Sequence, residues 1–275
     1  MADLTGTFLG KIVAARREKL AEARARVPLR VVQSAAEARS ERRDFAAALK
    51  GTTLRVIAEM KRASPSRGLL RRQYRPGEIA RAYELAGAAA LSVLTEGEHF
   101  LGSLDDLAKA REAGRLPVLR KDFILDDYQV HESVAAGADA LLLIVAALDD
   151  RALRNLLELA GRLRMAALVE VHTEAELERA LIAGAGILGV NNRDLKTLEV
   201  SLETSLRLRS KIPSTCLAVS ESGIQTPADL RRLEEAGYDA MLIGERLMTA
   251  SEPGKALTEL LEAFQPPVSK GAGAS

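Results

Sequence analysis

Glu59 and Lys61 stand two residues apart at the end of VIAEMK, an apolar run that begins at Val56 and is typical of a buried strand. Residues two apart in a strand face the same way, so both charges share one face with Ile57. An ammonium group and a carboxylate can donate and accept protons, and a strand tolerates such a pair where it opens into a pocket. We therefore expect chemistry at the end of this strand.

Charged or amide side chains also follow other apolar runs of the chain. They are Lys121 and Asp122, Glu170, Asn191 and Arg193, and Glu221. Salt bridges that close the top of a fold are the alternative explanation for any one of them. Because each unpaired buried ion is strongly destabilising, the number of these groups favours a functional site.

A repeated phrase indicates which elements position these residues. It reads AGAAALSVLTE from Ala86, AGADALLLIVA from Ala136, AGAGILGVNNR from Ala183 and AGYDAMLIGER from Ala236. Each glycine is placed to end a helix, and each apolar run that follows is typical of a strand buried on both faces. Further runs fall between the repeats: LRVIAEM from Leu54, LPVLRKD from Leu116, MAALVEV from Met165 and TCLAVSE from Thr215. Eight strands that alternate with helices predict an α/β fold of the (β/α)8 TIM barrel type, with a doubly wound open sheet as the alternative.

Three segments make up the expected domain organisation. Residues 1–46 form an N-terminal helical extension packed on the barrel, because FLGKIVAARREKLAEARARV has apolar residues at helical spacing. Residues 47–264 form the barrel, and residues 265–275 form a disordered tail. Gly184 to Gly189 match a dinucleotide fingerprint, but they follow a helix and lead into a strand, which reverses the order that the motif requires. We expect no cofactor.

Composition excludes several classes of protein. The chain has 275 residues, 47% of them hydrophobic, and a net charge of +1, which gives no general attraction to nucleic acid or to a membrane surface. The opening MADLTGTFLGKIVAARREKL lacks the apolar core of a signal peptide, so we expect a cytoplasmic protein. The single cysteine, Cys216, excludes an internal disulfide, and three widely separated histidines predict no metal site. We expect a small-molecule substrate and a monomer or weak homodimer.

Loops after the last two strands carry residues suited to an anion. Ser222–Gly223 and Gly244–Glu245 stand where α/β barrels often hold a phosphate on backbone N–H groups. The loop RASPSRGLLRR after the first strand contributes further cations, and its composition suits a mobile lid. These cations are Arg62, Arg67, Arg71 and Arg72. Ordinary turns and a solvated basic loop are the alternatives.

Two of only five phenylalanines, Phe100 and Phe123, fall just past the second and third strands. Large apolar groups beside charged ones suggest an aromatic substrate, and capping of the core is the alternative.

Together these stretches resemble the indole-3-glycerol-phosphate synthase family of tryptophan biosynthesis. The resemblance runs through IAEMKRASPSRG, SVLTEGEHFLGS, PVLRKDFILDDYQVHESVAAGADALLLI, LVEVHTEAELERAL, GVNNRDLKTLEV, VSESGI and LIGERLM. It implies conversion of 1-(2-carboxyphenylamino)-1-deoxyribulose 5-phosphate to indole-3-glycerol phosphate with loss of CO₂ and water, without metal or cofactor. Another phosphosugar barrel, such as phosphoribosylanthranilate isomerase or a Schiff-base aldolase, and an inactive barrel that acts as a binding partner are the alternatives.

The resemblance also implies roles for individual residues. Lys121 would be the general acid, assisted by Lys61, and a lysine suits this role if burial or neighbouring cations lower its pKa. Glu170 would be the base, with Glu59 as its rival. Other positions match supporting roles: Asn191, Glu221 and Arg193 in the polar network, Ser64, Ser222, Gly223 and Gly244 around the phosphate, and Phe100, Phe123 and Leu142 around the aromatic ring. Leu101 and Arg246 depart from the residues common in the family and leave substrate affinity open.

Overall fold

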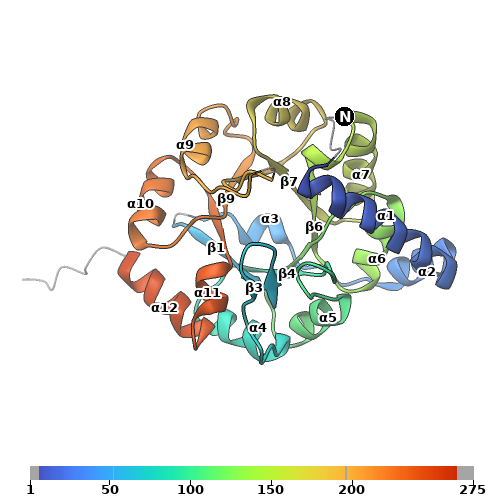
Figure 1. Cartoon of the computed structure of the whole chain (residues 1–275), viewed down its shortest axis with the longest axis horizontal. Helices are drawn as coiled ribbons and strands as arrows, with labels where there is room; N and C mark the ends of the chain where they lie inside the picture. The colour runs from blue at the N-terminus through green and yellow to red at the C-terminus, as the bar shows by residue number, and fades with distance from the viewer. Residues whose placement is uncertain (1–5, 52, 196, 265–275) are drawn as a thin grey trace, which may run out of the picture.

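Eight parallel strands close into a barrel in the computed structural model, which describes residues 6–51, 53–195 and 197–264 (Figure 1). The strands are β1 (Arg55–Met60), β4 (Ala90–Leu94), β5 (Val118–Lys121), β6 (Ala140–Ile144), β7 (Ala166–Val171), β8 (Ile187–Asn191), β9 (Leu217–Glu221) and β10 (Ala240–Ile243). Each pairs with the next barrel strand in the chain, and β1 closes the ring by pairing with both β4 and β10. The predicted TIM barrel is confirmed. The tail expected at residues 265–275 lies outside the described residues.

Helices follow the strands and surround the barrel (Figure 1). They are α4 (Pro76–Leu85), α5 (Leu104–Glu112), α6 (Asp127–Ala135), α7 (Asp150–Arg162), α8 (Glu174–Ile182), α9 (Glu203–Arg209), α10 (Pro227–Glu235), α11 (Glu245–Thr249) and α12 (Pro253–Phe264), with a 3₁₀ turn, η1 (Val145–Ala147), after β6. Ser103, Asp126 and Thr173 begin three of them by accepting a backbone N–H of the first turn. None of the helices in the described ranges is long and apolar enough to span a membrane.

The glycines of the repeated phrase end helices as predicted. Gly87, Gly137, Gly184 and Gly237 have φ angles of 89°, 101°, 90° and 93°, a region that a residue without Cβ enters freely. Gly189, the last glycine of the apparent dinucleotide motif, lies inside β8. The motif therefore runs from a helix end into a strand, the opposite of a phosphate-binding turn.

Side chains alternate between the inside and the outside of the barrel along each strand. In β1, Val56 and Met60 pack against the surrounding helices, whereas Ile57 belongs to the apolar filling of the barrel. Glu59 follows Ile57 on the inward face and is only 5% exposed. The apolar filling thus ends where the charged residues begin.

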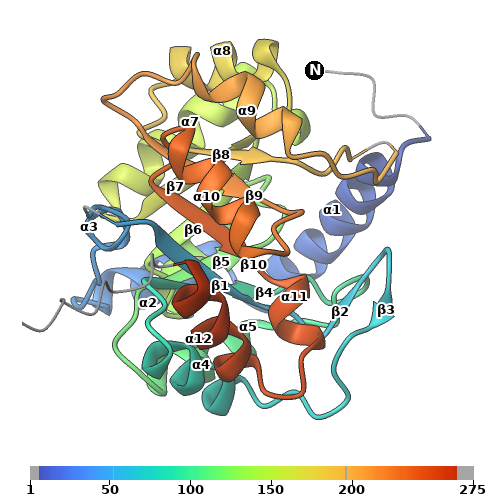
Figure 2. The ribbon, with the colours of Figure 1, turned by 90° about the vertical axis from the view of Figure 1, so that its left-hand side faces the viewer.

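Three helices precede the barrel within the described residues: α1 (Phe8–Arg26), α2 (Leu29–Ala38) and α3 (Phe45–Ala48). Figure 2 shows α1 on the same side of the barrel as a hairpin formed by β2 (Ala63–Ser64) and β3 (Gly68–Leu69), with α3 on the opposite side. Arg16 of α1 pairs with the buried Asp122 directly after β5, at 2.5 Å between Nη2 and Oδ2. This contact ties α1 to the strand ends.

Asp139, directly before β6, joins the segment that precedes the barrel to the barrel itself. Its carboxylate accepts hydrogen bonds from Arg39 Nη2 at 2.9 Å and from Arg111 Nη1 at 2.7 Å. It also accepts the backbone N–H groups of Arg43 and Val118, both at 3.0 Å. One carboxylate that is 1% exposed therefore balances two guanidinium groups and two backbone donors.

Asp139→Ala should lower the free energy of unfolding by about 3–5 kcal/mol, because it leaves the two guanidinium groups without their buried counter-charge. Urea denaturation measures this loss. Asp150→Ala is the matched control, since the Asp150 carboxylate is 70% exposed where it pairs with Arg179 and its removal should change stability little. Equal losses for the two variants would contradict the role assigned to Asp139.

Candidate active site

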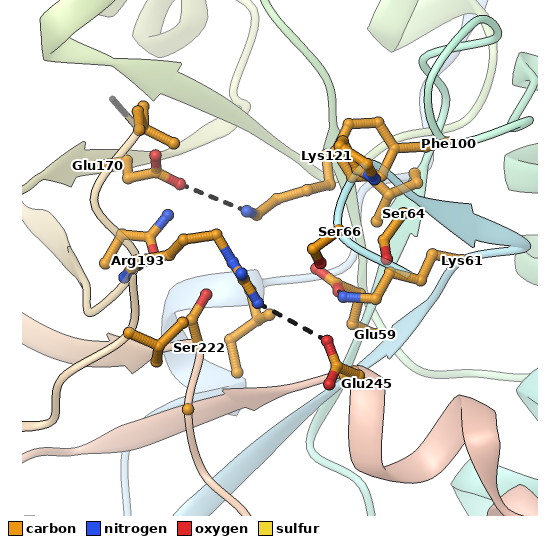
Figure 3. Close-up of a pocket in the computed structure, with 18 of the residues that line it drawn as sticks. Glu59, Lys61, Ser64, Ser66, Phe100, Lys121, Glu170, Arg193, Ser222 and Glu245 are labelled. Atoms are coloured by element: carbon orange, nitrogen blue, oxygen red, sulfur yellow. Dashed lines mark hydrogen bonds and ion pairs between the residues drawn. The ribbon is translucent and has the colours of Figure 1, made fainter. Parts of the chain in front are cut away.

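A cavity of about 410 Å³ opens at the carboxyl ends of the barrel strands. Neither Glu221 nor the four arginines expected from the loop after β1 lie among the residues that line it. The other site residues predicted from the sequence do line it: Glu59, Lys61, Ser64, Phe100, Lys121, Phe123, Leu142, Glu170, Asn191, Arg193, Ser222, Gly223, Gly244 and Glu245. In Figure 3 the side chains of Glu170 and Lys121 point toward each other, and Arg193 reaches across the cavity to Glu245. The barrel thus gathers residues that lie far apart in the sequence.

Lys121, the last residue of β5, is the cation at the centre of the site. Its Nζ lies 3.3 Å from Oε2 of Glu170 and 3.1 Å from Oε2 of Glu221. Burial would lower the pKa of Lys121, but the negative charges of Glu221, Glu170 and Glu59 outweigh burial and raise the pKa above its ordinary value. The lowered pKa that we required of a lysine acid is therefore absent in this arrangement, because its neighbours are carboxylates and not cations.

Glu221 lies just behind the cavity wall and is 1% exposed. Its carboxylate fits there because position 189 is glycine, where a Cβ atom would come within 2.1 Å of Oε1 of Glu221. Burial raises the pKa of Glu221 to about 7, with Lys121 opposing and Glu170 and Glu59 reinforcing the rise. Glu221 therefore changes charge near neutral pH.

Glu59 and Lys61 form the second charged pair of the site. The Nζ of Lys61 donates a hydrogen bond of 2.6 Å to Oε1 of Glu59, as expected for residues on one face of a strand. Burial would raise the pKa of Glu59, but the charges of Lys61 and Lys121 lower it below its ordinary value. Gly244 leaves room for this carboxylate, since a Cβ atom there would lie 2.2 Å from Oε1 of Glu59.

Glu170, near the end of β7, is 2% exposed, and its two carboxylate oxygens lie beside different side chains. Oε2 faces Lys121, and Oε1 lies 3.5 Å from Nε2 of His172. Sequence reasoning missed His172, although its position two residues after Glu170 places it on the same face of the strand.

The loops after β8, β9 and β10 form the polar end of the cavity. Ser222 and Gly223 follow β9 with φ angles of 68° and 80°, and the left-handed conformation is unusual for serine. Asn192 holds this turn by donating its Nδ2 hydrogens to the Ser222 carbonyl and to Oγ of Ser220, both at 3.1 Å. Asn192 was also missed, and its only signal in the sequence is its place beside Asn191.

Glu245 begins α11 at the same end of the cavity. It pairs with Nε of Arg67 at 2.9 Å and with Nη2 of Arg193 at 3.6 Å. Of the arginines expected near the mouth, Arg71 instead donates to the backbone carbonyls of Ala250 and Ser251, a structural role. The polar end therefore already holds a carboxylate between two guanidinium groups.

Apolar side chains also line the cavity. Phe100, Phe123 and Leu142 line it as predicted, and α1 adds Phe8, whose ring meets the ring of His99 edge to face at a centroid distance of 5.4 Å. Sequence reasoning missed Phe8 because α1 is distant from the strands in the chain.

The two departures from the family pattern lie outside the cavity wall. Neither Leu101 nor Arg246 is among the residues that line the cavity. Leu101 has a φ of 53°, a conformation that glycine or a small polar residue adopts at lower cost than leucine.

Comparison with known proteins gives the chain a family. The profile of the indole-3-glycerol phosphate synthase family matches residues 9–260. A protein of that name from Polaromonas sp. (strain JS666 / ATCC BAA-500) is 53% identical over 257 residues, covering 92% of this chain and 97% of that protein. Another from Mycobacteroides abscessus is 49% identical over 259 residues, covering 94% of this chain and 95% of that protein.

Solved structures of distant sequence share the fold. A mandelate oxidase variant superposes with a TM-score of 0.59 at 19% identity, covering 76% of this chain and 70% of that one. A thiamine phosphate pyrophosphorylase from Pyrococcus furiosus gives 0.59 at 18% identity, covering 77% of this chain and 95% of that one. At such identities the likeness concerns the barrel alone, whereas the family match spans the cavity residues. The chain belongs to the indole-3-glycerol phosphate synthase family.

Proposed function

We propose that the chain closes the indole ring of 1-(2-carboxyphenylamino)-1-deoxyribulose 5-phosphate, with loss of CO₂ and water, and that Lys121 and Glu170 carry the proton transfers. The observation that supports these roles is the contact of 3.3 Å between Lys121 Nζ and Glu170 Oε2 inside the cavity. An acid and a base within contact distance of each other can transfer protons to and from the same bound substrate in successive steps. Aromatic side chains and Arg193 line the same cavity, which suits a substrate with both an aromatic ring and a phosphate.

Lys121 acts as the general acid of ring closure. Attack of the aromatic carbon on the ribulose carbonyl places negative charge on an oxygen, which needs a proton. The carboxylates around Lys121 raise its pKa and keep its ammonium group charged before the reaction. A substrate that separates Lys121 from these carboxylates removes the cause of the raised pKa, so Lys121 becomes a better donor as the alkoxide forms.

Glu170 is the better candidate for the base. Lys61 and Lys121 lower the pKa of Glu59, which makes Glu59 a weak proton acceptor. Glu170 contacts one lysine, Lys121, and one histidine, His172, and lines the cavity directly. Asn191 and Glu221 orient the lysines and the substrate hydroxyls.

The phosphate binds at the polar end, on the backbone N–H groups of Gly223 and Gly244 and beside Arg193. Ser64 supports this assignment, because its buried Oγ lines the cavity and lacks a hydrogen-bond partner among the described residues. Phe100, Phe123 and Leu142 hold the aromatic ring. We further propose that the enzyme works in the cytoplasm as a monomer or weak homodimer.

Lys121→Ala should abolish turnover, followed as the rise of indole fluorescence, while the variant still binds a product analogue, because the general acid is lost and the walls remain. Lys211→Ala is the control, since Lys211 pairs with Glu174 on the surface. Wild-type-like turnover by Lys121→Ala would contradict its role.

Borohydride added with substrate should trap no imine, as an adduct would indicate an aldolase.

Glu170→Gln should lower kcat by roughly 10²–10⁴-fold, the usual contribution of a proton-transfer residue. Glu59→Gln is the comparison, since it removes the rival carboxylate while keeping the shape of the side chain. Steady-state kinetics of both variants distinguish the two assignments. A drop of only a few fold for Glu170→Gln, with a larger one for Glu59→Gln, would make Glu59 the base.

Glu221→Gln should change how stability depends on pH. The pKa of Glu221 is raised from 4.5 to about 7 by folding, so its contribution to stability is fully present below about pH 4.5 and is lost as the pH rises through about 7. The free energy of unfolding of the wild type, minus that of the variant, should therefore decrease as the pH is raised from about 4.5 to about 7. Glu235→Gln, on an exposed helix face, should give a constant difference. A constant difference for Glu221→Gln as well would contradict the raised pKa.

A further inference from the structure

His172 connects the candidate base to a second carboxylate outside the cavity. It directly follows β7, and its side chain lies between Glu170 on the strand and Glu176 in the first turn of α8. Nε2 of His172 lies 3.5 Å from Oε1 of Glu170, and Nδ1 lies 3.1 Å from Oε2 of Glu176. The three side chains form a carboxylate–imidazole–carboxylate series that ends at the site.

The position of the imidazole is fixed from the side of α8. Oε2 of Glu176 accepts the backbone N–H of His172 at 2.7 Å as well as meeting its Nδ1. Burial would raise the pKa of Glu176, but the hydrogen bond and charge of His172 lower it, so Glu176 is an ionised acceptor. Nδ1 therefore carries the hydrogen, and Nε2 is the nitrogen that gains or loses a proton.

The titrating nitrogen faces Glu170. Nε2 is buried and has no hydrogen-bond partner among the described residues, which leaves the carboxylate at 3.5 Å as its charged neighbour. Burial would lower the pKa of His172, but the hydrogen bond to Glu176 and the charges of Glu170, Glu176 and Glu221 raise it. The nearby cations interact with the two carboxylates: Lys121 contacts Glu170, and the charge of Arg179 acts on Glu176.

We propose that His172 is a positioning residue for Glu170: held by Glu176, its imidazolium keeps the Glu170 carboxylate turned toward Lys121. Each oxygen of Glu170 then has its own cation: Lys121 at Oε2 and His172 at Oε1. When Lys121 gives its proton to the substrate and loses its charge, His172 remains beside Oε1 of Glu170 and holds the carboxylate in place. The base therefore keeps its orientation for the dehydration step that follows.

The direct test is the titration of His172 by NMR with labelled histidine. The spectrum is simple to assign because the chain has only three histidines. The pKa of His172 should lie above that of an exposed histidine in the wild type. Glu170→Gln and Glu176→Gln should each lower it by about one unit, because each removes a negative charge within contact distance. Glu178→Gln, on the exposed face of the same helix, should leave it unchanged. An unchanged titration in Glu170→Gln would overturn the proposal.

Kinetics of two replacements of His172 form the second test, and only this test rests on the role proposed for Glu170 as base. Asn reproduces the donor that meets Glu176 but cannot reach Glu170, whereas Gln reaches toward Glu170 without a charge. Both should move the acidic limb of the kcat profile to higher pH by about one unit, with KM within about twofold. His172→Asn should show the larger shift.

A residue that only maintains the fold would give a different result. The profile would keep its shape, with kcat lowered equally at every pH, and that outcome would overturn the proposal. Glu176→Gln, which keeps its hydrogen bonds, repeats the test without altering the imidazole. Glu170→Gln could lower the pKa of His172 in the NMR titration and yet show no loss of kcat. In that case the role of Glu170 as base fails, and the electrostatic interaction between His172 and Glu170 stands.

Discussion

One lysine among three buried carboxylates is the interaction on which the site depends. Lys121 contacts Glu170 and Glu221, and the charge of Glu59 also acts on it. Three carboxylates this close would repel one another without a central cation, and a buried cation would be unstable without them. The backbone is shaped around the group, since Gly189 and Gly244 lack the Cβ atoms that would collide with Glu221 and Glu59. Two glycines therefore have a packing role that their φ angles alone do not reveal.

The fold was predictable because its signals are local. Gly87, Gly137, Gly184 and Gly237 mark helix ends, and each is followed by a run with the length of a buried strand. Once these strands close into a barrel, the last inward-facing residue of each must lie at one mouth. This geometry places Glu59, Lys121, Glu170, Asn191 and Glu221 together from their positions in the sequence, before any distance is known.

The rest of the site depends on contacts that the sequence does not encode locally. Phe8 reaches the cavity because α1 lies on the side of the barrel where the strands end (Figure 2), and its distance from the strands in the chain hides this. Asn192 and His172 act through partners on other elements. The sequence allows a lowered pKa of Lys121, through burial or neighbouring cations, whereas the three carboxylates around Lys121 raise its pKa. The balance of burial against charge requires the three-dimensional arrangement.

The cations of the cavity are already paired, and this constrains how an anionic substrate binds. Lys61 holds Glu59, Lys121 holds Glu170 and Glu221, and Arg193 lies beside Glu245. A substrate group that forms an ion pair with one of these cations exchanges places with a protein carboxylate, so the net gain from that contact is the difference between two ion pairs. A ligand with one anionic group would displace one carboxylate and leave the other pairs intact. A ligand with a carboxylate and a phosphate at the right separation exchanges partners at both ends, and selectivity follows from that spacing more than from attraction to free positive charge.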